Sequence, residues 1–252
     1  HENRECRIDA LAQAWSVLSG VASSERAEAA MDQVESQLIS DDERLVRLLT
    51  PPFVDTPRDP GYIRGYVAGV RENGGQYTHA ATWVVRAMAQ LGRRDRAAAL
   101  LDLLNPVLHA ATPAGCARYL VEPYVVAADV YGAEPHVGRG GWTWYTGSSG
   151  WLQRVALESV LGVQIEEGEV LVVAPCIPDD WPRFSVEWRL PGDRTTYEIV
   201  VANPGGCSAA VVAVTMDGET LVPCAGRARL PLRRDGARHQ VEITLGEGGT
   251  KA

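Results

Sequence analysis

Four large aromatic side chains and five glycines lie close together in the segment GRGGWTWYTGSSGW, residues 138–151. The aromatic residues are Trp142, Trp144, Tyr145 and Trp151. Flat aromatic faces next to glycines are typical of a site where a sugar ring stacks, since glycine lets the backbone approach a ligand closely. The same rings could pack in a core, but glycines add no core volume. The composition of this segment therefore favours a carbohydrate site.

Two predicted helix starts carry groups that can surround an oxyanion. The run TGSSG, residues 146–150, comes directly before one predicted helix, where backbone N–H groups and hydroxyls can bind an anion. The run RENGGQYTH, residues 71–79, places His79 in the first turn of a second predicted helix. Neither turn contains an acidic residue, so the pattern predicts a guest such as phosphate. The simpler alternatives are that Thr146 is an ordinary N-cap and that His79 is a structural histidine.

Two glutamates in aromatic, glycine-rich surroundings are further candidates. Glu72 lies in RENGG and Glu122 in VEPYV. Either could hydrogen-bond sugar hydroxyls or serve as an acid or a base, although most exposed glutamates do neither. His109, His136 and His239 are not at metal-ligand spacing, and neither are the cysteines. We therefore expect no metal site and no cofactor.

The composition of the 252-residue chain is that of an ordinary soluble globular protein, with 46% hydrophobic and 22% charged residues. A formal net charge of −8 argues against nucleic-acid binding, which needs a basic face. No apolar run approaches the ~18 to 20 residues of a membrane helix. The five cysteines are widely spaced, which predicts reduced, mostly buried thiols in a cytoplasmic protein.

Helical periodicity runs through residues 1–161, where apolar residues recur at three- and four-residue spacing between Gly and Pro breaks. The pattern predicts an apolar stripe from Ile8 to Leu18 and a helix from Ser23 or Ser24 that buries Ala27, Met31, Val34 and Leu38. Further helices are predicted over 76–91, 94–104, 123–130 and 147–161. Long loops rich in Gly, Pro and aromatic residues, 51–75, 111–122 and 131–146, separate them, and loops of this length are usually functional.

After Gly162 the period changes to two. Short alternating runs such as TTYEIVVAN and HQVEITLG are separated by turn residues such as Pro191-Gly192-Asp193 and Asp217-Gly218. The pattern predicts an antiparallel β-sandwich or sheet domain of about six to eight strands over 162–252. The last residues, 247–252, are predicted to fray. The chain is thus a multidomain α+β protein.

Eight motifs, taken in order, resemble the C-terminal part of the family 94 glycoside phosphorylases over nearly the whole chain. Within that family they are most similar to the phosphorylase-like region of cyclic β-1,2-glucan synthases and to 1,2-β-oligoglucan phosphorylases. Each motif alone is weak, but the ordered set is specific. The motifs are RIDALAQAWSVLSG, LLTPPF, DPGYIRGY, RENGGQYTHAATW, LLNPVLH, VEPYVVAADVY, GRGGWTWYTGSSGW and APCIPDDWP.

The resemblance implies an (α/α)6 barrel followed by a C-terminal β-sheet domain, and inverting phosphorolysis. In that reaction a general acid protonates the glycosidic oxygen while phosphate, the co-substrate, attacks the anomeric carbon from the opposite face. Phosphate is already anionic, so no second carboxylate is needed as a base, unlike inverting hydrolysis.

The family's phosphate ligands correspond to His79, Thr146 and Gly147, and we add Ser148 as a candidate. Its sugar contacts come from segments that match those holding Tyr66, Arg71, Glu72 and Glu122. We add four further candidate sugar contacts from the same motifs: Gln76, Tyr124, Trp142 and Trp144.

One departure from the family pattern is decisive. The family's general acid is an aspartate in an Asp-Trp-Asn-Asp segment upstream of RIDALAQAW, and the 252 residues contain no such segment. Only about six of the twelve barrel helices are predicted, and the chain begins with His1. We therefore expect the C-terminal half of an (α/α)6 barrel plus the sheet domain, without a catalytic acid of its own.

The sequence is compatible with three functional hypotheses. The first is a C-terminal fragment of a phosphorylase module acting on β-1,2-glucan, part of a cytoplasmic protein or of the cytoplasmic portion of a larger inner-membrane protein. The others are an inverting hydrolase using Glu72 and Glu122, and a non-catalytic carbohydrate-binding module. The expected partners are a β-linked glucan or glucooligosaccharide, phosphate and the N-terminal remainder of the same protein. Because half a barrel leaves apolar faces open, the chain should also dimerise or associate.

Overall fold

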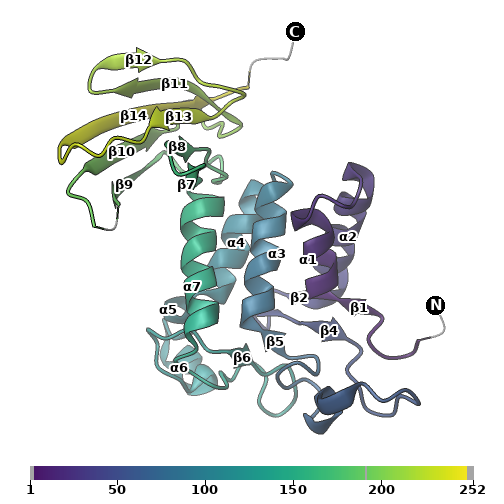
Figure 1. Cartoon of the computed structure of the whole chain (residues 1–252). Helices are drawn as coiled ribbons and strands as arrows, with labels where there is room; N and C mark the ends of the chain where they lie inside the picture. Colours follow the sequence, from purple (N-terminus) through teal and green to yellow (C-terminus); the bar gives the residue numbers. More distant parts are fainter. Residues whose placement is uncertain (1–2, 191, 249–252) are drawn as a thin grey trace. The chain divides into compact units, whose positions relative to one another are not determined.

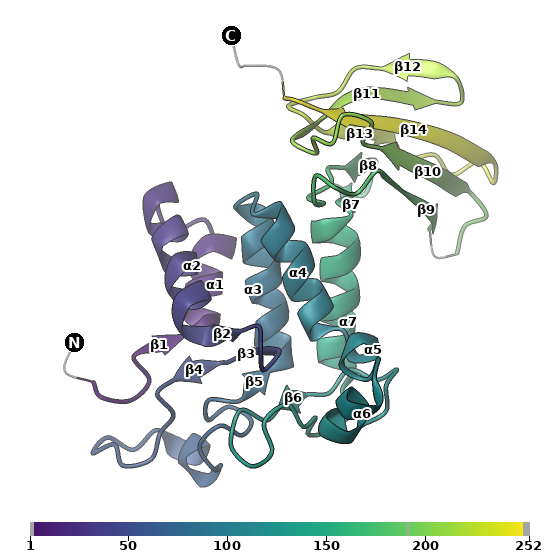
Figure 2. The same cartoon turned by 180° about the vertical axis from the view of Figure 1, so that it is seen from behind.

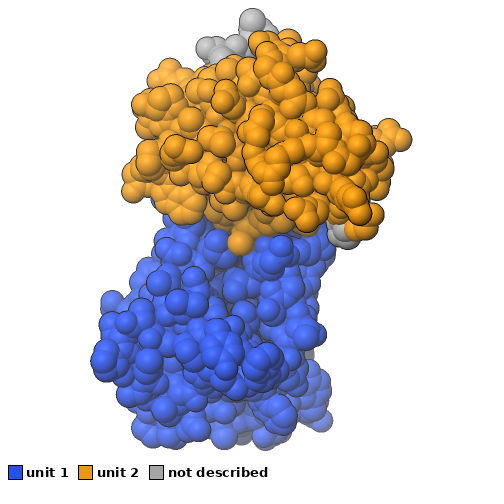
Figure 3. All heavy atoms as spheres, turned by 90° about the vertical axis from the view of Figure 1, so that its left-hand side faces the viewer, with its two compact units in different colours: residues 1–155 blue, residues 156–252 orange. Residues whose placement is uncertain are grey.

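The computed structural model describes residues 3–190 and 192–248, which form two compact units with their border between Val155 and Ala156 (Figure 3). Pro191 of one predicted turn and residues 249–252 of the predicted frayed end lie outside the described residues. Among those described, no helix is long and apolar enough to cross a membrane.

Five helices in two layers form the frame of the first unit (Figures 1 and 2). Helices α1 (Ala10–Leu18), α3 (Thr78–Gln90) and α7 (Thr146–Arg154) are neighbours in one layer. Helix α2 (Ser24–Leu38) packs on α1, and α4 (Arg94–Leu104) packs on α3. The four apolar residues predicted on the second helix are all buried, together with side chains of α1, α3 and α4. The predicted amphipathic stripes therefore form the interface between the layers.

The loops at one end of these helices hold short elements. Three two-stranded pairs are formed by β1 (Ile8–Asp9) with β4 (Leu49–Thr50), β2 (Ile39–Ser40) with β3 (Leu45–Val46), and β5 (Gln76–Tyr77) with β6 (Asp129–Val130). The same loops contain a 3₁₀ helix over Gly61–Gly65 and the short helices α5 (Pro106–His109) and α6 (Pro113–Tyr119). A π-helical turn, Val155–Val160, follows α7.

The predicted helix over 123–130 is wrong. The backbone there hydrogen-bonds to neighbouring segments instead of to itself: the Ala128 N–H donates to the Trp142 carbonyl at 2.6 Å, and the Ala128 carbonyl accepts from the Thr78 N–H at 2.9 Å. Conversely, the region predicted as a loop over 111–122 contains α6, which begins with Pro113 and is capped by the Thr112 hydroxyl. A threonine N-cap and a proline at the first helical position are both helix-start signals, and the loop prediction for 111–122 did not take them into account.

The second unit consists of two sheets. A five-stranded sheet has the order β12-β11-β14-β10-β9, and a three-stranded sheet has the order β13-β8-β7. The strands are β7 (Val163–Glu166), β8 (Val170–Val173), β9 (Arg183–Arg189), β10 (Thr196–Ala202), β11 (Ala210–Met216), β12 (Glu219–Leu221), β13 (Ala228–Pro231) and β14 (Arg238–Gly246).

Most strand pairs in this unit are antiparallel, as predicted, but β10 and β14 run parallel. The purely antiparallel expectation is wrong at this pair because β11, β12 and β13 lie between the two strands in the chain, and such a long connection permits a parallel return. Alternate residues of the central strands face the core, including the fully buried Ile199, Val201 and Ile243.

Cysteine burial differs from the sequence expectation. None of the five cysteines forms a disulfide, but only Cys176 of the five is buried, whereas Cys116 and Cys224 are exposed. Spacing indicates whether thiols can pair, and it carries little information on burial.

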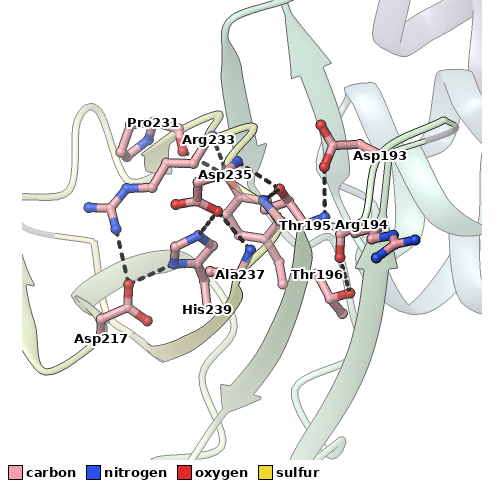
Figure 4. A network of polar contacts seen from close by, with 12 residues as sticks. Asp193, Arg194, Thr195, Thr196, Asp217, Pro231, Arg233, Asp235, Ala237 and His239 are labelled. Atoms are coloured by element: carbon pink, nitrogen blue, oxygen red, sulfur yellow. Dashed lines mark hydrogen bonds and ion pairs between the residues drawn. The ribbon is translucent and has the colours of Figure 1, made fainter.

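A polar network joins β14 to two loops of the second unit (Figure 4). The Nδ1 of His239 lies 2.8 Å from Asp217 Oδ2, and its Nε2 lies 3.2 Å from Asp235 Oδ1. Asp217 also accepts hydrogen bonds from Arg233 Nη1 at 3.2 Å and from the Gln240 N–H at 3.0 Å. The hydrogen bond from His239 is the main cause that lowers the pKa of Asp217.

This network predicts a pH-dependent contribution to stability. Asp217→Asn should lower the stability of the second unit at pH 7 by roughly 1 kcal/mol, the scale of one hydrogen bond at a partly exposed site. A carboxyl group whose pKa is lowered in the folded state stabilises the fold fully at pH values above its unfolded pKa of about 4. This stabilisation is lost as the pH falls through the pKa of the folded state. The difference between wild type and variant should therefore shrink below about pH 4. Hydrogen exchange of the β10 and β14 amides measures this stability difference, with Glu219→Gln as the control variant. An equal difference between wild type and Asp217→Asn at pH 3 and pH 7 would contradict the prediction.

Candidate functional site

The first turns of α3 and α7 lie beside each other. His79 is the second residue of α3, and Gly147 is the second residue of α7. A Cβ placed on Gly147 would lie 3.9 Å from both Nδ1 and Cε1 of the His79 ring. The two helix starts picked out in the sequence thus converge in the fold.

Both helix starts leave their first N–H groups without a capping side chain among the described residues. The N-cap residues are Tyr77 and Tyr145, neither of which makes a side-chain cap hydrogen bond, and neither first turn contains an acidic residue. Thr146 is the first helical residue, so its interpretation as a simple N-cap is wrong. In α3 the first of these groups is already used, because the Thr78 N–H donates to the Ala128 carbonyl at 2.9 Å. The N–H groups that follow it and those at the start of α7, together with the helix dipoles, favour an anion.

The His79 ring is half-buried between tryptophans. Its centroid lies 4.7 Å from Trp83 and 6.0 Å from Trp151, and its buried Nε2 has no hydrogen-bond partner within residues 3–190 and 192–248. Burial lowers the pKa of His79 below its ordinary value of 6.5, so the free ring is neutral at pH 7. A neutral imidazole beside two helix N-termini can still donate one N–H to an oxyanion.

Of the two remaining phosphate candidates, Thr146 is exposed and Ser148 is buried. The Ser148 hydroxyl donates to the Tyr145 carbonyl at 3.2 Å, within the start of its own helix. What Ser148 can offer an anion is therefore mainly its backbone N–H.

A pocket of about 120 Å³ opens beside the start of α7. It is lined by Tyr124, Val125, Val126, Trp144, Tyr145, Thr146 and Ser149. The rings of Tyr124 and Trp144 meet edge to face at 6.3 Å, and Trp144 Nε1 donates to Glu122 Oε1 at 3.1 Å. The pocket combines aromatic walls with hydroxyls, which suits a sugar next to an anion.

Glu122 is a poor proton donor in this setting. Hydrogen bonds from its own backbone N–H and from Trp144 lower the pKa of Glu122 below 4.5. The carboxylate is therefore ionised at neutral pH and can accept hydrogen bonds, but it cannot supply the proton that a hydrolase acid must give.

A second group of predicted sugar contacts surrounds Arg71. Its guanidinium carbon lies 5.6 Å from the ring centroids of both Tyr66 and Trp142, a cation–π arrangement on two sides. Its Nε lies 3.5 Å from Glu72 Oε2. The side chains of Tyr66, Arg71, Glu72 and Trp142 therefore come together as one cluster, which we call the Arg71 cluster.

Gln76 differs from the other candidates because its side chain is buried. Its Oε1 accepts from the Val46 N–H at 3.0 Å, and its Nε2 contacts the Thr78 hydroxyl at 3.5 Å. These bonds hold the start of α3 in place, and a direct sugar contact from Gln76 stays a prediction.

Asp129 is the residue of this region that the sequence analysis missed. It is fully buried in β6, and its Oδ1 lies 3.6 Å from Arg71 Nη1. The available signal was an aspartate inside the apolar run VVAADVYG, since a buried carboxylate needs a partner. Within the described parts of the chain, no group of three or more His, Cys, Asp or Glu side chains could hold a metal ion.

Comparison with known proteins identifies the class of protein that these features belong to. Residues 1–162 match the catalytic domain of the glycosyl hydrolase 94 superfamily, and the chain belongs to that family. The family resemblance carried by the ordered motifs is confirmed.

Three relatives place the chain within the family. It is 51% identical over 213 residues, or 84% of its length, to the cyclic β-(1,2)-glucan synthase NdvB of Rhizobium meliloti. It is 35% identical to the N,N'-diacetylchitobiose phosphorylase of Vibrio proteolyticus and 31% identical to the solabiose phosphorylase of Paenibacillus borealis, each over 97% of the chain. The chain spans 7% of the synthase and 29% and 30% of the two phosphorylases.

Proposed function

We propose that this chain is the phosphate-binding part of an inverting glycoside phosphorylase that acts on β-1,2-linked glucan. The observation that carries the proposal is the meeting of His79 with Gly147 at two uncapped helix starts, directly beside the aromatic pocket. Phosphate would sit on these helix starts, and the sugar would stack on the neighbouring rings.

The chemistry assigned to this chain is binding and orientation. His79, Thr146 and the N–H groups of Gly147 and Ser148 would hold phosphate with one oxygen toward the anomeric carbon. Phosphate is a nucleophile without further deprotonation, so the chain needs no general base. The acid that protonates the leaving oxygen is assigned to an Asp-Trp-Asn-Asp segment of a longer protein, since the 252 residues contain none.

The β-1,2 linkage is the finer part of the proposal. It is supported by the 51% identity to a cyclic β-(1,2)-glucan synthase, against 35% and 31% to the two disaccharide phosphorylases. The two helical layers would be half of an (α/α)6 barrel, completed by the N-terminal remainder of the same protein. We place this catalytic region in the cytoplasm.

A phosphate titration tests the site itself. Inorganic phosphate should shift the imidazole NMR signals of His79 in a saturable manner and leave those of the exposed His136 unchanged. Sulfate should compete, because it has the same tetrahedral shape, and chloride should not. Equal small shifts at both histidines would mean that phosphate acts only through ionic strength, which would contradict the proposal.

A further inference from the structure

Within the described residues, three buried polar atoms without hydrogen-bond partners lie in the Arg71 cluster and in Asp129, which pairs with Arg71. They are Arg71 Nη1, Glu72 Oε2 and Asp129 Oδ2, and they belong to residues joined by the 3.5 and 3.6 Å ion pairs. Asp129 is 0% exposed, while Arg71 is 13% and Glu72 is 16% exposed in the side chain. A fully buried carboxylate is costly unless it is paired, so its presence here needs a reason.

The surroundings of Asp129 leave space for its carboxylate and for little else. A Cβ on Gly141 would lie 2.2 Å from Asp129 Oδ1, so only glycine fits there without movement. The Trp142 N–H lies 3.4 Å from the same oxygen, and the Gly141 N–H donates to the Asp129 carbonyl at 2.8 Å. Asp129 therefore contacts both Arg71 and the backbone that carries Trp142.

Strand pairing connects Asp129 to the phosphate site as well. Tyr77, directly before α3, pairs with Asp129 in the β5–β6 ladder. Burial raises the pKa of Asp129, and the Arg71 guanidinium opposes that effect.

From this geometry we propose that Asp129 is a positioning residue: it fixes the Arg71 guanidinium, which in turn holds the exposed ring of Trp142 in place for a sugar. Trp142 is 62% exposed, so only a small part of its side chain is packed against the rest of the unit. The Arg71 guanidinium, with its carbon 5.6 Å from the ring centroid, supplies a contact that orders the ring, and the exposed part of the ring would stack on the sugar. The sugar-binding part of this inference rests on the proposed function, whereas the ordering of the ring does not.

The test measures the order of the Trp142 ring directly. In the ¹⁵N-labelled chain, the indole signal of Trp142 is assigned by its loss in Trp142→Phe, and its heteronuclear NOE reports fast motion of the ring. Asp129→Asn and Arg71→Lys should both lower this NOE, because the first removes the charge that fixes Arg71 and the second removes the planar stack. Trp144, held by Glu122, should keep its value. The control is Asp41→Asn, which breaks an ion pair with Arg96 elsewhere in the same unit.

A double-mutant cycle then tests the sugar step, with β-1,2-linked glucotriose as the probe. Asp129→Asn should weaken its affinity about 2- to 30-fold, the range of a cation–π contact. In the Trp142→Ala background the same substitution should cost less, because the route through the ring is gone and only a direct contact of Arg71 with the sugar remains. An unchanged Trp142 NOE in folded Arg71→Lys and Asp129→Asn variants would overturn the inference, and so would an equal loss of affinity in both backgrounds. A wild-type chain that binds no glucotriose would count against the proposed function. The NOE of Trp142 alone would then test the role of Asp129. If Asp129→Asn does not fold, the NOE of Trp142 in Arg71→Lys is the measurement that decides the inference.

Discussion

The 252-residue chain alone is expected to cleave β-1,2-linked glucooligosaccharides about 10²- to 10⁴-fold more slowly than a protein that also carries the Asp-Trp-Asn-Asp segment, because this is the contribution of a positioned proton donor. Two carboxylates near the pocket are unsuited to replace that donor. Glu122 is ionised at neutral pH, and Asp129 is fully buried and paired with Arg71. The measurement is the initial rate of glucose 1-phosphate release by the two proteins at equal concentration.

The outcome that contradicts this prediction is full activity in the short chain. In that case a carboxylate of the chain must be the acid, and Glu72→Gln and Glu122→Gln identify which one. A loss of activity in Glu72→Gln alone would assign the acid to Glu72. Neither substitution should matter for phosphate binding, which gives the matched control.

Replacement of His79 by alanine should weaken phosphate binding by about 10- to 100-fold in the intact enzyme, since a charge-assisted hydrogen bond contributes roughly 1.5 to 3 kcal/mol. Thr146→Val keeps the shape but loses the hydroxyl, and it should cost less because the backbone N–H groups of α7 remain. Isothermal titration with phosphate measures both losses. His136→Ala, a change at an exposed loop histidine, should leave the affinity unchanged.

The contacts of His79 with Trp83 and Trp151 define the competing explanation. If the ring only packs between the tryptophans, His79→Ala should lower thermal stability without changing phosphate affinity in the folded protein. A loss of affinity at unchanged melting temperature separates a ligand from a structural histidine.

The helix pairs could be predicted from the sequence because their apolar stripes repeat at the helical period. Met31, Val34 and Leu38 illustrate this, since each lies where the 3.6-residue period places it, in the core. Local periodicity failed where tertiary contacts decide the backbone. Residues 123–130 contain a helix-compatible run of alanines and valines, but the bonds of Ala128 to Thr78 and Trp142 draw the segment into an extended path. The parallel pairing of β10 with β14 is equally non-local.

The candidate site was predictable to the extent that its residues sit at helix starts. His79 and Gly147 could be selected because each opens a helix without an acidic neighbour, and the fold then brought them together. Asp129 could not be selected in this way, because its importance comes from a partner 58 positions earlier in the chain, Arg71, and from the space left by Gly141. An aspartate in an apolar run indicates from sequence that a partner is needed, but only the fold shows which residue that partner is.

The most direct test of the whole account is the dependence of glucan cleavage on phosphate, measured on a protein that contains this chain together with the catalytic aspartate segment. With β-1,2-linked glucooligosaccharides as substrate, we predict that cleavage requires inorganic phosphate, yields glucose 1-phosphate of inverted, α configuration, and is lost in proportion to phosphate affinity in His79→Ala. Release of free glucose at the same rate without phosphate would identify a hydrolase and contradict the account.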